Sequence, residues 1–338
     1  MTALIACSDG AVRWILAALL VLAPACSGGR DENAPTSASA PKPVSIAAPV
    51  TPDARTEVAG AAWQNLVIVA GGMTQDGSAS SRVDAFDTAT GTWSQAPPLP
   101  VPVHHAGAAV AAGRLWIVGG YTNGAGQAPV AIANAVSIGP GEAAWRIESP
   151  LPQARAALAL VSARDVLVAI GGVVDGKPSG STVMLRIGQG WEDGPPLANA
   201  REHHAAAAAG PRIYAIAGRT GGLESNIGSV ESLDIRTPGR GWRGEPGLND
   251  SRGGTAAAAA PDGKQICVAG GEQASGTIAS VECFSDGRWD RAATMNTPRH
   301  GLAAVWHGDG LHLVAGGNQP GLNTSNVHEL FTQGLPRR

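Results

Sequence analysis

The chain has 338 residues with a formal net charge of −3, 15% charged residues, 46 Gly and 24 Pro. The near-neutral charge gives no support to binding of nucleic acid or of an anionic membrane surface. Abundant Gly and Pro with few charges favour one large all-β domain with many short strands and tight turns. The sequence contains no P-loop, no HExxH motif and no zinc-type cysteine spacing, so we predict no cofactor and no metal.

The N-terminal segment has the pattern of an export signal. Arg13 precedes an apolar run of ten residues, Trp14–Ala23, and this run is too short to span a bilayer. Small residues follow it, and Ala25 stands directly before Cys26. The arrangement resembles a bacterial lipoprotein signal, which implies that residues 1–25 are removed and that Cys26 is acylated. Ordinary secretion with cleavage nearby is the alternative.

Residues 26–43 are rich in Ser, Ala, Pro and Gly and cannot bury an apolar core. We interpret them as a flexible tether that leads to a folded domain at 44–331, followed by a short tail at 332–338. Together with the lipoprotein resemblance, the tether predicts a protein held in the bacterial envelope, in the periplasm or at the outer membrane. It would contact the membrane only through its lipid anchor.

The folded domain contains an internal repeat. An apolar run that ends in a Gly pair recurs six times, and the first Gly of successive pairs are 48, 52, 47, 52 and 46 residues apart. These positions are Gly71, Gly119, Gly171, Gly218, Gly270 and Gly316. In the fourth repeat we align Gly218 and Arg219 with the pair, so that Arg219 replaces the second Gly. A period of about 50 residues is found among the repeats of β-propellers.

Two further landmarks follow each pair in register. An apolar residue marks the third strand of each repeat: Phe86, Ile138, Leu185, Leu233, Phe284 and Phe331. A tryptophan marks the fourth strand of five repeats: Trp93, Trp145, Trp191, Trp242 and Trp289. Ten residues after the tryptophan, the next repeat begins with Arg155, Arg201, Arg252 or Arg299, and in one case with Val103. Each repeat therefore predicts four short strands, called a to d below.

Each feature of the repeat has a physical reason. Small residues in strand a, such as the run Ala205–Ala209, suit an innermost strand, because several sheets crowd there around one axis. The Gly pair allows backbone conformations denied to other residues, and the large tryptophan fills the space between neighbouring sheets. The Gly pair, tryptophan and Pro-x-Arg pattern resembles the Kelch family across residues 44–331. The resemblance implies an all-β, six-bladed Kelch-type β-propeller with four antiparallel strands in each blade.

The sixth repeat ends at Phe331 without a tryptophan or a strand d. The missing strand is found at the other end of the domain, where residues 44–54 resemble the segments that begin with tryptophan. In this alignment Val44 takes the tryptophan position and Arg55 comes one place late. We therefore predict that residues 44–49 form a strand beside the one that ends at Phe331. This N-terminal strand would close the last blade and remove two exposed sheet edges.

Two cysteines, Cys267 and Cys283, lie on neighbouring strands of the fifth repeat. Export from the cytoplasm would permit a disulfide between them. The sequence leaves a bridge and a pair of buried free thiols open, because it does not fix the distance between the two Cα atoms.

Antiparallel strands place the b–c loops and the d–a connections on the same face of a propeller. The residues that begin strand a therefore surround one mouth of the central channel. The candidate ligand-binding residues at this mouth are Arg155, Arg201, Glu202, His203, His204, Arg252, Arg299, His300, His104 and His105, with Arg55 and Glu57 nearby. One interpretation is a positive funnel for an anionic or polyhydroxylated ligand.

The recurrence of the arginine at one repeat position favours a second interpretation, in which it is a structural residue bonded to backbone carbonyls of an adjacent blade. The histidines do not share one repeat position in our alignment, which makes them better functional candidates. A metal site built from them is the less favoured alternative. The b–c loop of the second repeat is about four residues longer than the others and carries Tyr121, a further candidate. A tolerated insertion is the alternative explanation of this loop.

We predict a monomeric, non-enzymatic binding module that recognises a protein or glycan partner in the envelope, because no catalytic constellation stands out. The Kelch resemblance leaves one enzymatic alternative, the six-bladed sialic acid mutarotases of bacteria, which need an acid/base carboxylate and an arginine near the channel. Glu202 with Arg201 or Arg252, or Glu224, would supply them. Copper chemistry of the galactose oxidase type is excluded, because the chain has only two Tyr and no Cys placed for the crosslink.

The lipoprotein interpretation predicts that Cys26→Ser removes the site of acylation. We expect this variant to move from the membrane to the soluble fraction, or to remain uncleaved, after expression in a Gram-negative host. Ser37→Ala in the tether leaves the signal intact and is the matched control. Soluble wild-type protein with a mature N-terminus other than Cys26 would contradict the interpretation.

Overall fold

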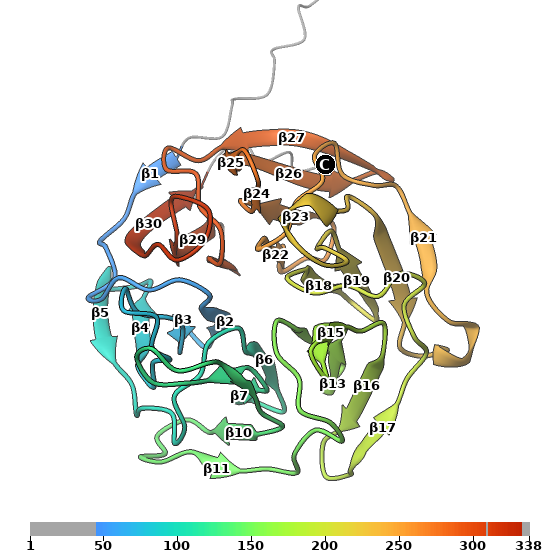
Figure 1. The fold of residues 1–338 in the computed structure, drawn as a ribbon, viewed down its shortest axis with the longest axis horizontal. Coiled ribbons are helices and arrows are strands. Elements are labelled where there is room, and N and C mark those ends of the chain that lie inside the picture. The colour runs from blue at the N-terminus through green and yellow to red at the C-terminus, as the bar shows by residue number, and fades with distance from the viewer. Residues whose placement is uncertain (1–44, 309, 333–338) are drawn as a thin grey trace, which may run out of the picture. The chain divides into compact units, whose positions relative to one another are not determined.

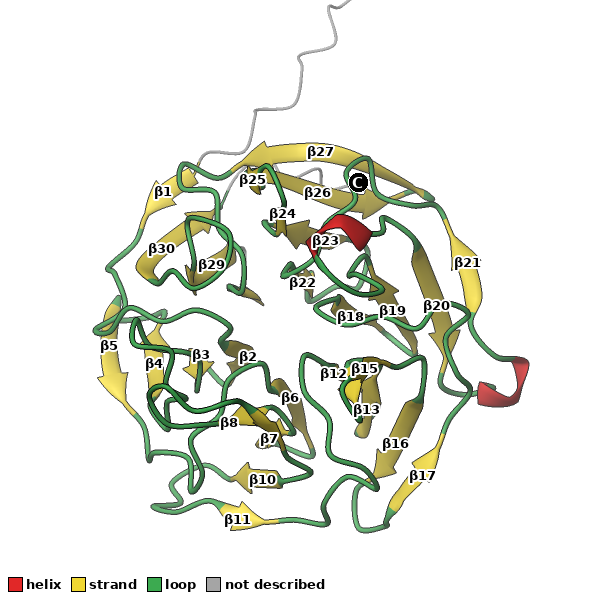
Figure 2. Cartoon of the chain, viewed as in Figure 1, coloured by secondary structure: helices red, strands yellow, loops and turns green. Residues whose placement is uncertain are grey.

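The computed structural model describes residues 45–308 and 310–332. The predicted signal peptide, the lipidation site Cys26, the tether and all but the first residue of the predicted tail lie outside the described residues. Within the described ranges, no helix is long and apolar enough to cross a membrane. These ranges consist of strands, turns and loops with two short 3-10 helices, η1 (Leu223–Ser225) and η2 (Pro238–Arg240) (Figure 2).

Six four-stranded antiparallel sheets stand around a central axis, one for each repeat, so the predicted six-bladed propeller is confirmed (Figure 1). Blade 1 contains β2 (Ala59–Trp63), β3 (Leu66–Ala70), β4 (Val83–Asp87) and β5 (Thr92–Gln95). Blade 2 contains β6 (Gly107–Ala111), β7 (Arg114–Val118), β10 (Ala135–Ile138) and β11 (Arg146–Ile147). Blade 3 contains β12 (Ala159–Ala163), β13 (Val166–Ile170), β16 (Thr182–Arg186) and β17 (Trp191–Asp193).

The other three blades repeat this order. Blade 4 contains β18 (Ala205–Ala209), β19 (Arg212–Ile216), β20 (Val230–Asp234) and β21 (Arg243–Glu245). Blade 5 contains β22 (Ala256–Ala259), β23 (Ile266–Ala269), β26 (Ser280–Ser285) and β27 (Arg288–Thr294). Blade 6 contains β28 (Ala303–His307), β29 (Gly310–Gly316), β30 (Ser325–Phe331) and β1 (Ser45–Ala47).

Short hairpins extend the b–c loops of three blades. They are β8 (Tyr121–Thr122) with β9 (Val130–Ala131), β14 (Val173–Val174) with β15 (Lys177–Pro178), and β24 (Glu272–Gln273) with β25 (Gly276–Thr277). Isolated bridges join these loops to the d–a connections, as between His104 and Tyr121. The loops and connections therefore lie on one face, as the strand directions predict.

The a strands are the innermost strands, and each contacts the a strands of both neighbouring blades. Their small residues follow from this crowding. A Cβ added to Gly60 of β2 would lie 2.5 Å from the Cβ of Ala303 in the preceding blade. A Cβ added to Gly107 of β6 would lie 2.4 Å from the Cβ of Leu160. Carbon atoms cannot approach so closely, so glycine is required at these two positions.

The N-terminal strand closes blade 6, as the count of strands predicts. β1 pairs antiparallel with β30, and Ser45 stands opposite Phe331. Backbone hydrogen bonds continue beyond the strand, from Thr51 N–H to the carbonyl of Asn326 at 2.9 Å. Phe331 is fully buried. The first and last described strands therefore complete one sheet, and blade 6 has four strands like the other blades.

The register of this strand differs by one residue from the alignment based on sequence. Trp93 stands opposite Phe86 in blade 1, and Ser45 has the same place opposite the apolar landmark of blade 6. Ser45, not Val44, therefore occupies the tryptophan position. Arg55 then follows after ten residues, at the same interval as in the other repeats, and is not displaced.

The Gly pair of two repeats also shifts by one residue. Gly71–Gly72 has φ values of 61° and 100°. Ala217–Gly218 in blade 4 has φ values of 59° and 98°, and Ala315–Gly316 in blade 6 has 59° and 102°. In these two blades an alanine therefore adopts the first left-handed position of the pair. The prediction that Arg219 replaces a Gly is wrong, because Arg219 is the residue that follows the pair.

The five tryptophans that mark strand d connect neighbouring blades by hydrogen bonds as well as by packing. Each indole N–H donates to a backbone carbonyl in the connection that leads into its blade. The pairs are Trp93 with Pro49, Trp145 with Pro97, Trp191 with Ser149, Trp242 with Pro195 and Trp289 with Pro246, at 2.7–2.9 Å. The outer strand of one blade is thus tied to the chain arriving from the blade before it.

A disulfide links the two central strands of blade 5. Cys267 and Cys283 stand directly opposite each other on β23 and β26, and each is 1% exposed. Their Cα atoms lie 4.1 Å apart. The structure thus joins the two cysteines that the sequence placed on neighbouring strands.

The closure predicts different effects for two N-terminal deletions. Removing residues 27–43 should change the melting temperature little, whereas removing residues 27–52 also removes β1 and exposes the edge of β30 together with Phe331. Exposure of a side chain of this size costs about 1.5–3 kcal/mol, and the acceptor of the Trp93 indole is lost as well. Thermal unfolding followed by circular dichroism measures the difference. Equal melting temperatures of the two deletions would contradict the closure.

Candidate functional site

The arginines that begin the blades lie inside the sheets rather than at the channel mouth. Arg55, Arg155, Arg201, Arg252 and Arg299 are each 0–2% exposed. Nη1 of Arg155 donates to the carbonyl of Gly171 at 2.8 Å and to that of Ser181 at 2.9 Å. Gly171 directly follows strand b and Ser181 directly precedes strand c of the blade that the arginine begins, so the acceptors do not come from an adjacent blade. The four arginine candidates are therefore structural residues, and the predicted arginine-lined funnel does not form.

Four of these arginines also pair with a buried carboxylate on strand c. The pairs are Arg55 with Asp84, Arg201 with Glu231, Arg252 with Glu282 and Arg299 with Glu329. Each glutamate accepts a further hydrogen bond from a backbone N–H of the connection, at Ala198, Asn249 and Asn296 respectively, each at 2.8 Å. The carboxylate therefore joins the buried cation to a backbone donor that would otherwise have no partner.

Blade 2 lacks all three members of this arrangement. Val103 stands at the arginine position, Val136 at the carboxylate position and Pro100 at the position of the backbone donor. Proline has no N–H, so no donor is left unpaired. The three residues line a small apolar pocket with Leu99. In blade 2, apolar contacts thus replace the arginine, its carboxylate partner and the backbone N–H that binds the carboxylate.

Two residues after the arginine position, each connection reaches the channel axis. The six equivalent residues, called the axial ring, are Glu57, His105, Ala157, His203, Gly254 and Gly301. All six have left-handed backbones with φ between 48° and 64°. The N–H of each of the last five donates to the carbonyl of the ring residue before it, at 2.8–3.1 Å, and Val58 N–H closes the circle to Gly301 at 3.2 Å. Backbone hydrogen bonds therefore join all six blades around the axis.

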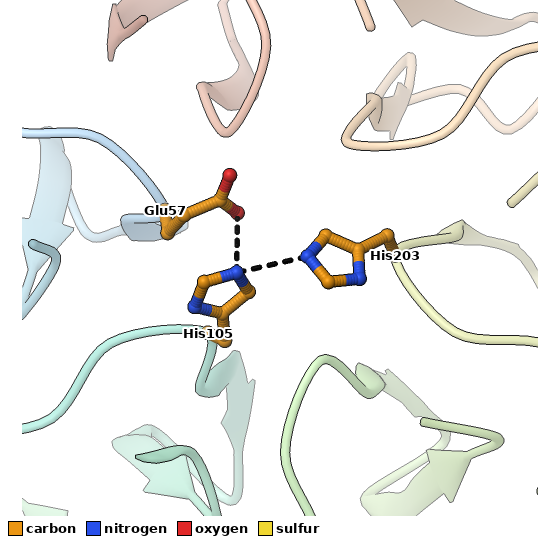
Figure 3. A group of neighbouring side chains, drawn as sticks. All are labelled: Glu57, His105 and His203. Atoms are coloured by element: carbon orange, nitrogen blue, oxygen red, sulfur yellow. Dashed lines mark hydrogen bonds and ion pairs between the residues drawn. The ribbon is translucent and has the colours of Figure 1, made fainter. Parts of the chain in front are cut away.

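Three side chains of the axial ring converge on the channel axis (Figure 3). Nε2 of His105 lies 3.2 Å from Oε2 of Glu57 and 2.9 Å from Nε2 of His203. One donor atom from each of the three residues lies within 4.8 Å of the other two. The side chains are 10–14% exposed, so small solutes can reach them. One carboxylate and two imidazoles form a donor set that suits a divalent metal ion.

Charged residues of blades 4 and 5 surround this cluster. Glu202 accepts a hydrogen bond at Oε2 from Nδ1 of His203 and another at Oε1 from Nε of Arg219 at 2.8 Å. The guanidinium of Arg219 also donates to Glu272 at 3.2 Å. Arg219 is thus the arginine beside Glu202, in place of Arg201 or Arg252, which the mutarotase hypothesis named.

The surroundings fix the charges of the cluster. Burial would raise the pKa of Glu57, but His105 and a hydrogen bond from Nδ1 of His300 at 3.1 Å lower it well below its usual range. Burial would lower the pKa of His300, but its bond to Glu57 raises it above the usual value. Burial lowers the pKa of His105 and of His203. These shifts favour the ionised form of Glu57 and the neutral forms of His105 and His203.

His204 adds a buried imidazole beside the cluster. It lines a cavity of about 80 Å³ together with Glu57, His105 and His203. It is 5% exposed, and neither ring nitrogen has a hydrogen-bond partner among the described residues. Burial, followed by the nearby arginines, lowers its pKa to about 3. Buried polar groups without a partner are rare in native proteins, so His204 is an unusual feature of this mouth.

His104 and Tyr121 extend the site toward the b–c loop of blade 2. Their rings lie 5.5 Å apart, and the ring of Tyr121 lies 5.7 Å from that of His105. Nδ1 of His104 contacts Nδ1 of His105, and its Nε2 lies 3.2 Å from Oδ1 of Asn123. Burial, followed by the proximity of His105, lowers the pKa of His104 to about 4. The long loop therefore contacts the axial cluster directly.

The candidates thus separate into two groups. Those at the mouth are Glu202, His203, His204, His300, His104, His105 and Tyr121, whereas the four arginines lie within the blades. Glu224, the other carboxylate considered for catalysis, is exposed on η1. Sequence reasoning did not identify Arg219 and Glu272 as site residues. It named Glu57 only as a neighbour of the site, whereas Glu57 belongs to the central cluster. It also missed that His105 and His203 share one repeat position, two residues after the arginine position.

Fold and site together define a six-bladed β-propeller with a polar mouth on its b–c loop face. A family model described as Kelch motif matches residues 54–100, which include blade 1. The chain is similar to Kelch-like protein terF of Aspergillus terreus, with 25% identity over 277 residues, covering 75% of this chain and 58% of that protein. It is also similar to Kelch-like protein 35 of Mus musculus, with 34% identity over 92 residues, covering 27% of this chain and 15% of that protein.

The six repeats and the matched motif identify the fold as a six-bladed Kelch-type β-propeller. The chain spans 58% of the length of the fungal relative and 15% of that of the mouse relative. The solved structure of YjhT is similar with a TM-score of 0.72 and 16% identity, over 84% of this chain and 96% of that chain. At this identity the likeness shows a shared fold.

The buried arginine arrangement predicts a partial rescue. Arg252→Val removes the cation that pairs with the buried carboxylate of Glu282 in blade 5, which should cost about 3–5 kcal/mol of unfolding free energy. Adding Asn249→Pro and Glu282→Val reproduces the three residues of blade 2, so the triple variant should be more stable than the single one. Urea unfolding measures both.

The exposed arginine of the same blade is the control for this series. Arg288→Val lies on β27 with its side chain 69% exposed and should change the free energy by no more than about 0.5 kcal/mol. A triple variant less stable than Arg252→Val would show that the buried ion pair is not the reason for the cost.

Proposed function

We propose that this Kelch-repeat propeller is a binding module whose b–c loop face recognises a protein or glycan partner. Kelch motifs and Kelch-like relatives support a protein-interaction module. The observation that carries the proposal is the contrast between the axial ring, whose backbone is the same in all six blades, and the loops beside it, which differ from blade to blade. Variable loops on a constant scaffold are the usual location of recognition.

The loops themselves offer mixed chemistry for a partner. Val130 on the β8–β9 hairpin is 60% exposed, and Leu322 on the b–c loop of blade 6 is 50% exposed. On the same face, the mouth contains the partly exposed imidazoles of His105 and His203 and the carboxylate of Glu57. Apolar contacts from the loops and directional polar contacts at the mouth together suit recognition of one defined surface.

We extend the proposal to location. The lipoprotein-like signal, the acylated Cys26 and the tether at 26–43 would hold the module in the bacterial envelope. The disulfide between Cys267 and Cys283 supports an oxidising compartment, because such bonds are rare in proteins of the cytosol.

The mutarotase alternative has one observation in its favour. Glu202 and Arg219 form the carboxylate–arginine pair near the channel that this hypothesis needs, and a cavity lies at the same mouth. Glu202 is also 5% exposed and bonded to His203, which favours a role in orienting its neighbours. The binding module therefore remains the proposal, and sugar mutarotation is the activity that would replace it.

Substitution of exposed apolar residues by aspartate, on the b–c loop face and on the opposite face, tests which face binds the partner. Val130→Asp with Leu322→Asp changes the proposed binding face. Ile187→Asp is the matched control, because Ile187 is 37% exposed on a c–d turn of the opposite face. Immobilised wild-type and variant proteins are incubated with a glycan array and with solubilised envelope extract. We expect binding to fall at least about tenfold, or about 1.4 kcal/mol, only in the double variant.

Two results would contradict this proposal. Equal binding by all three proteins would move the interaction away from the b–c loop face. Mutarotation of sialic acid by the purified protein, followed by NMR and lost in Glu202→Gln, would identify an enzyme instead.

A further inference from the structure

The donor geometry at the channel axis fits a metal ion of a defined size. Zn²⁺ binds imidazole nitrogen at about 2.0–2.1 Å and carboxylate oxygen at similar distances, so tetrahedral donors lie about 3.3 Å apart. Nε2 of His105 lies 3.2 Å from Oε2 of Glu57 and 2.9 Å from Nε2 of His203. Two of the three donor separations are thus already close to this value, and the third, between Glu57 and His203, is no more than 4.8 Å.

Each donor residue is held by a partner on its other side, which directs the free atom toward the axis. Nδ1 of His203 is bonded to the carboxylate of Glu202. Nδ1 of His105 contacts the ring of His104. Glu57 is held through Oε1 by His300, which leaves Oε2 toward the axis. A carboxylate behind a histidine is the arrangement that orients metal-binding imidazoles and raises their basicity.

The backbone supports the same arrangement. Glu57, His105 and His203 all lie in the axial ring with left-handed φ values of 52°, 56° and 49°, a conformation that costs energy in residues other than glycine. Glycine at ring position 301 leaves room for the carboxylate, because a Cβ there would lie 2.5 Å from Oε1 of Glu57. The ring thus aims three donors inward from blades 1, 2 and 4 and has no side chain in the way.

The remaining side of the cluster is open to a further ligand. The ring residues Ala157 and Gly254 offer no polar side chain. His204, whose imidazole has no hydrogen-bond partner among the described residues, also lines the cavity of about 80 Å³ beside the cluster. Three protein donors with an adjacent cavity are typical of zinc sites that keep a position for water or an exogenous ligand.

The geometry points to a binding site for one divalent transition metal ion, Zn²⁺ or an ion of similar preference, formed by Glu57, His105 and His203. Glu202 and His104 act as positioning residues behind the two histidines. Two imidazoles with one carboxylate favour such ions over Mg²⁺ and Ca²⁺, which prefer sites made entirely of oxygen. The site goes beyond the proposed binding module and does not depend on its partner.

Isothermal titration of the untagged protein with Zn²⁺ alone tests the site. We expect one ion per chain for the wild type. His105→Ala, His203→Ala and Glu57→Gln should each weaken binding by more than about 100-fold, and Glu202→Gln by about 10–100-fold. His307→Ala is the matched control, because His307 lies on β28 away from the cluster and bonds the carbonyl of Gln64. Its affinity should equal that of the wild type, and Mg²⁺ and Ca²⁺ should give no binding heat.

Co²⁺ gives a second measurement that reports on the ligands directly. Visible absorption of the Co²⁺-loaded wild type should show the intense bands of a low-coordinate site, and Glu57→Gln should change or remove them. Gly301→Ala keeps all three donors but displaces the carboxylate of Glu57, so it should also weaken Zn²⁺ binding. Melting temperatures without metal identify any variant that fails to fold, and the isosteric Glu57→Gln then carries the test.

Two outcomes would overturn the inference. Wild-type protein that takes up no Zn²⁺ at 100-fold molar excess would leave the cluster as a hydrogen-bonded network only. Zn²⁺ binding that is the same in Glu57→Gln, His105→Ala and His203→Ala as in the wild type would place the ion elsewhere on the chain.

Discussion

The buried arginine at the start of a blade is the interaction on which the channel mouth depends. Its guanidinium binds carbonyls at the end of strand b and before strand c, from a connection that arrives from the preceding blade. The chain is thereby fixed two residues before it turns left-handed at the axial ring. A cation buried this deeply requires partners for its charge and donors, and three blades supply a glutamate that also binds the connection. Blade 2 reaches the same backbone with Val103 and apolar packing, so the connection can be fixed in two chemically different ways.

The sequence predicts the fold well because each landmark reflects a contact that recurs in most of the blades. The tryptophan ties outer strands to the preceding connection, and the small residues of strand a allow inner strands to meet. The sequence alignment of the Gly pairs is wrong by one residue in blades 4 and 6, because there the first left-handed position is occupied by alanine and not by glycine. Ala217 and Ala315 adopt left-handed backbones that sequence reasoning reserves for Gly, at a cost of about 1–2 kcal/mol each that the surrounding contacts offset. In blade 6 the structural pair is Ala315–Gly316. Gly317 follows it directly, so the sequence alignment chose Gly316–Gly317 instead.

The site is less predictable because its contacts join blades that are distant in the sequence. The residue types could be found, since seven of the predicted candidates lie at the mouth. Their partners could not, because no local pattern shows that His105 meets His203 across 98 residues or that Arg219 bridges Glu202 and Glu272. The repeat position of the arginines favoured a structural role, but it did not reveal that their acceptors lie just after strand b and just before strand c of the same blade.

In the axial ring, the backbone conformation does not depend on which side chain each position carries. Six equivalent positions share one backbone conformation, although they carry one glutamate, two histidines, an alanine and two glycines. Ala157 already tolerates the left-handed backbone with φ 48°, and histidine and aspartate enter this conformation more readily than most residues. Single substitutions at Ala157 or Gly254 could therefore add a new side chain at the axis, whereas Gly301 is constrained by the carboxylate beside it. Related propellers can thus diverge in activity through changes at a few codons, with the scaffold held constant.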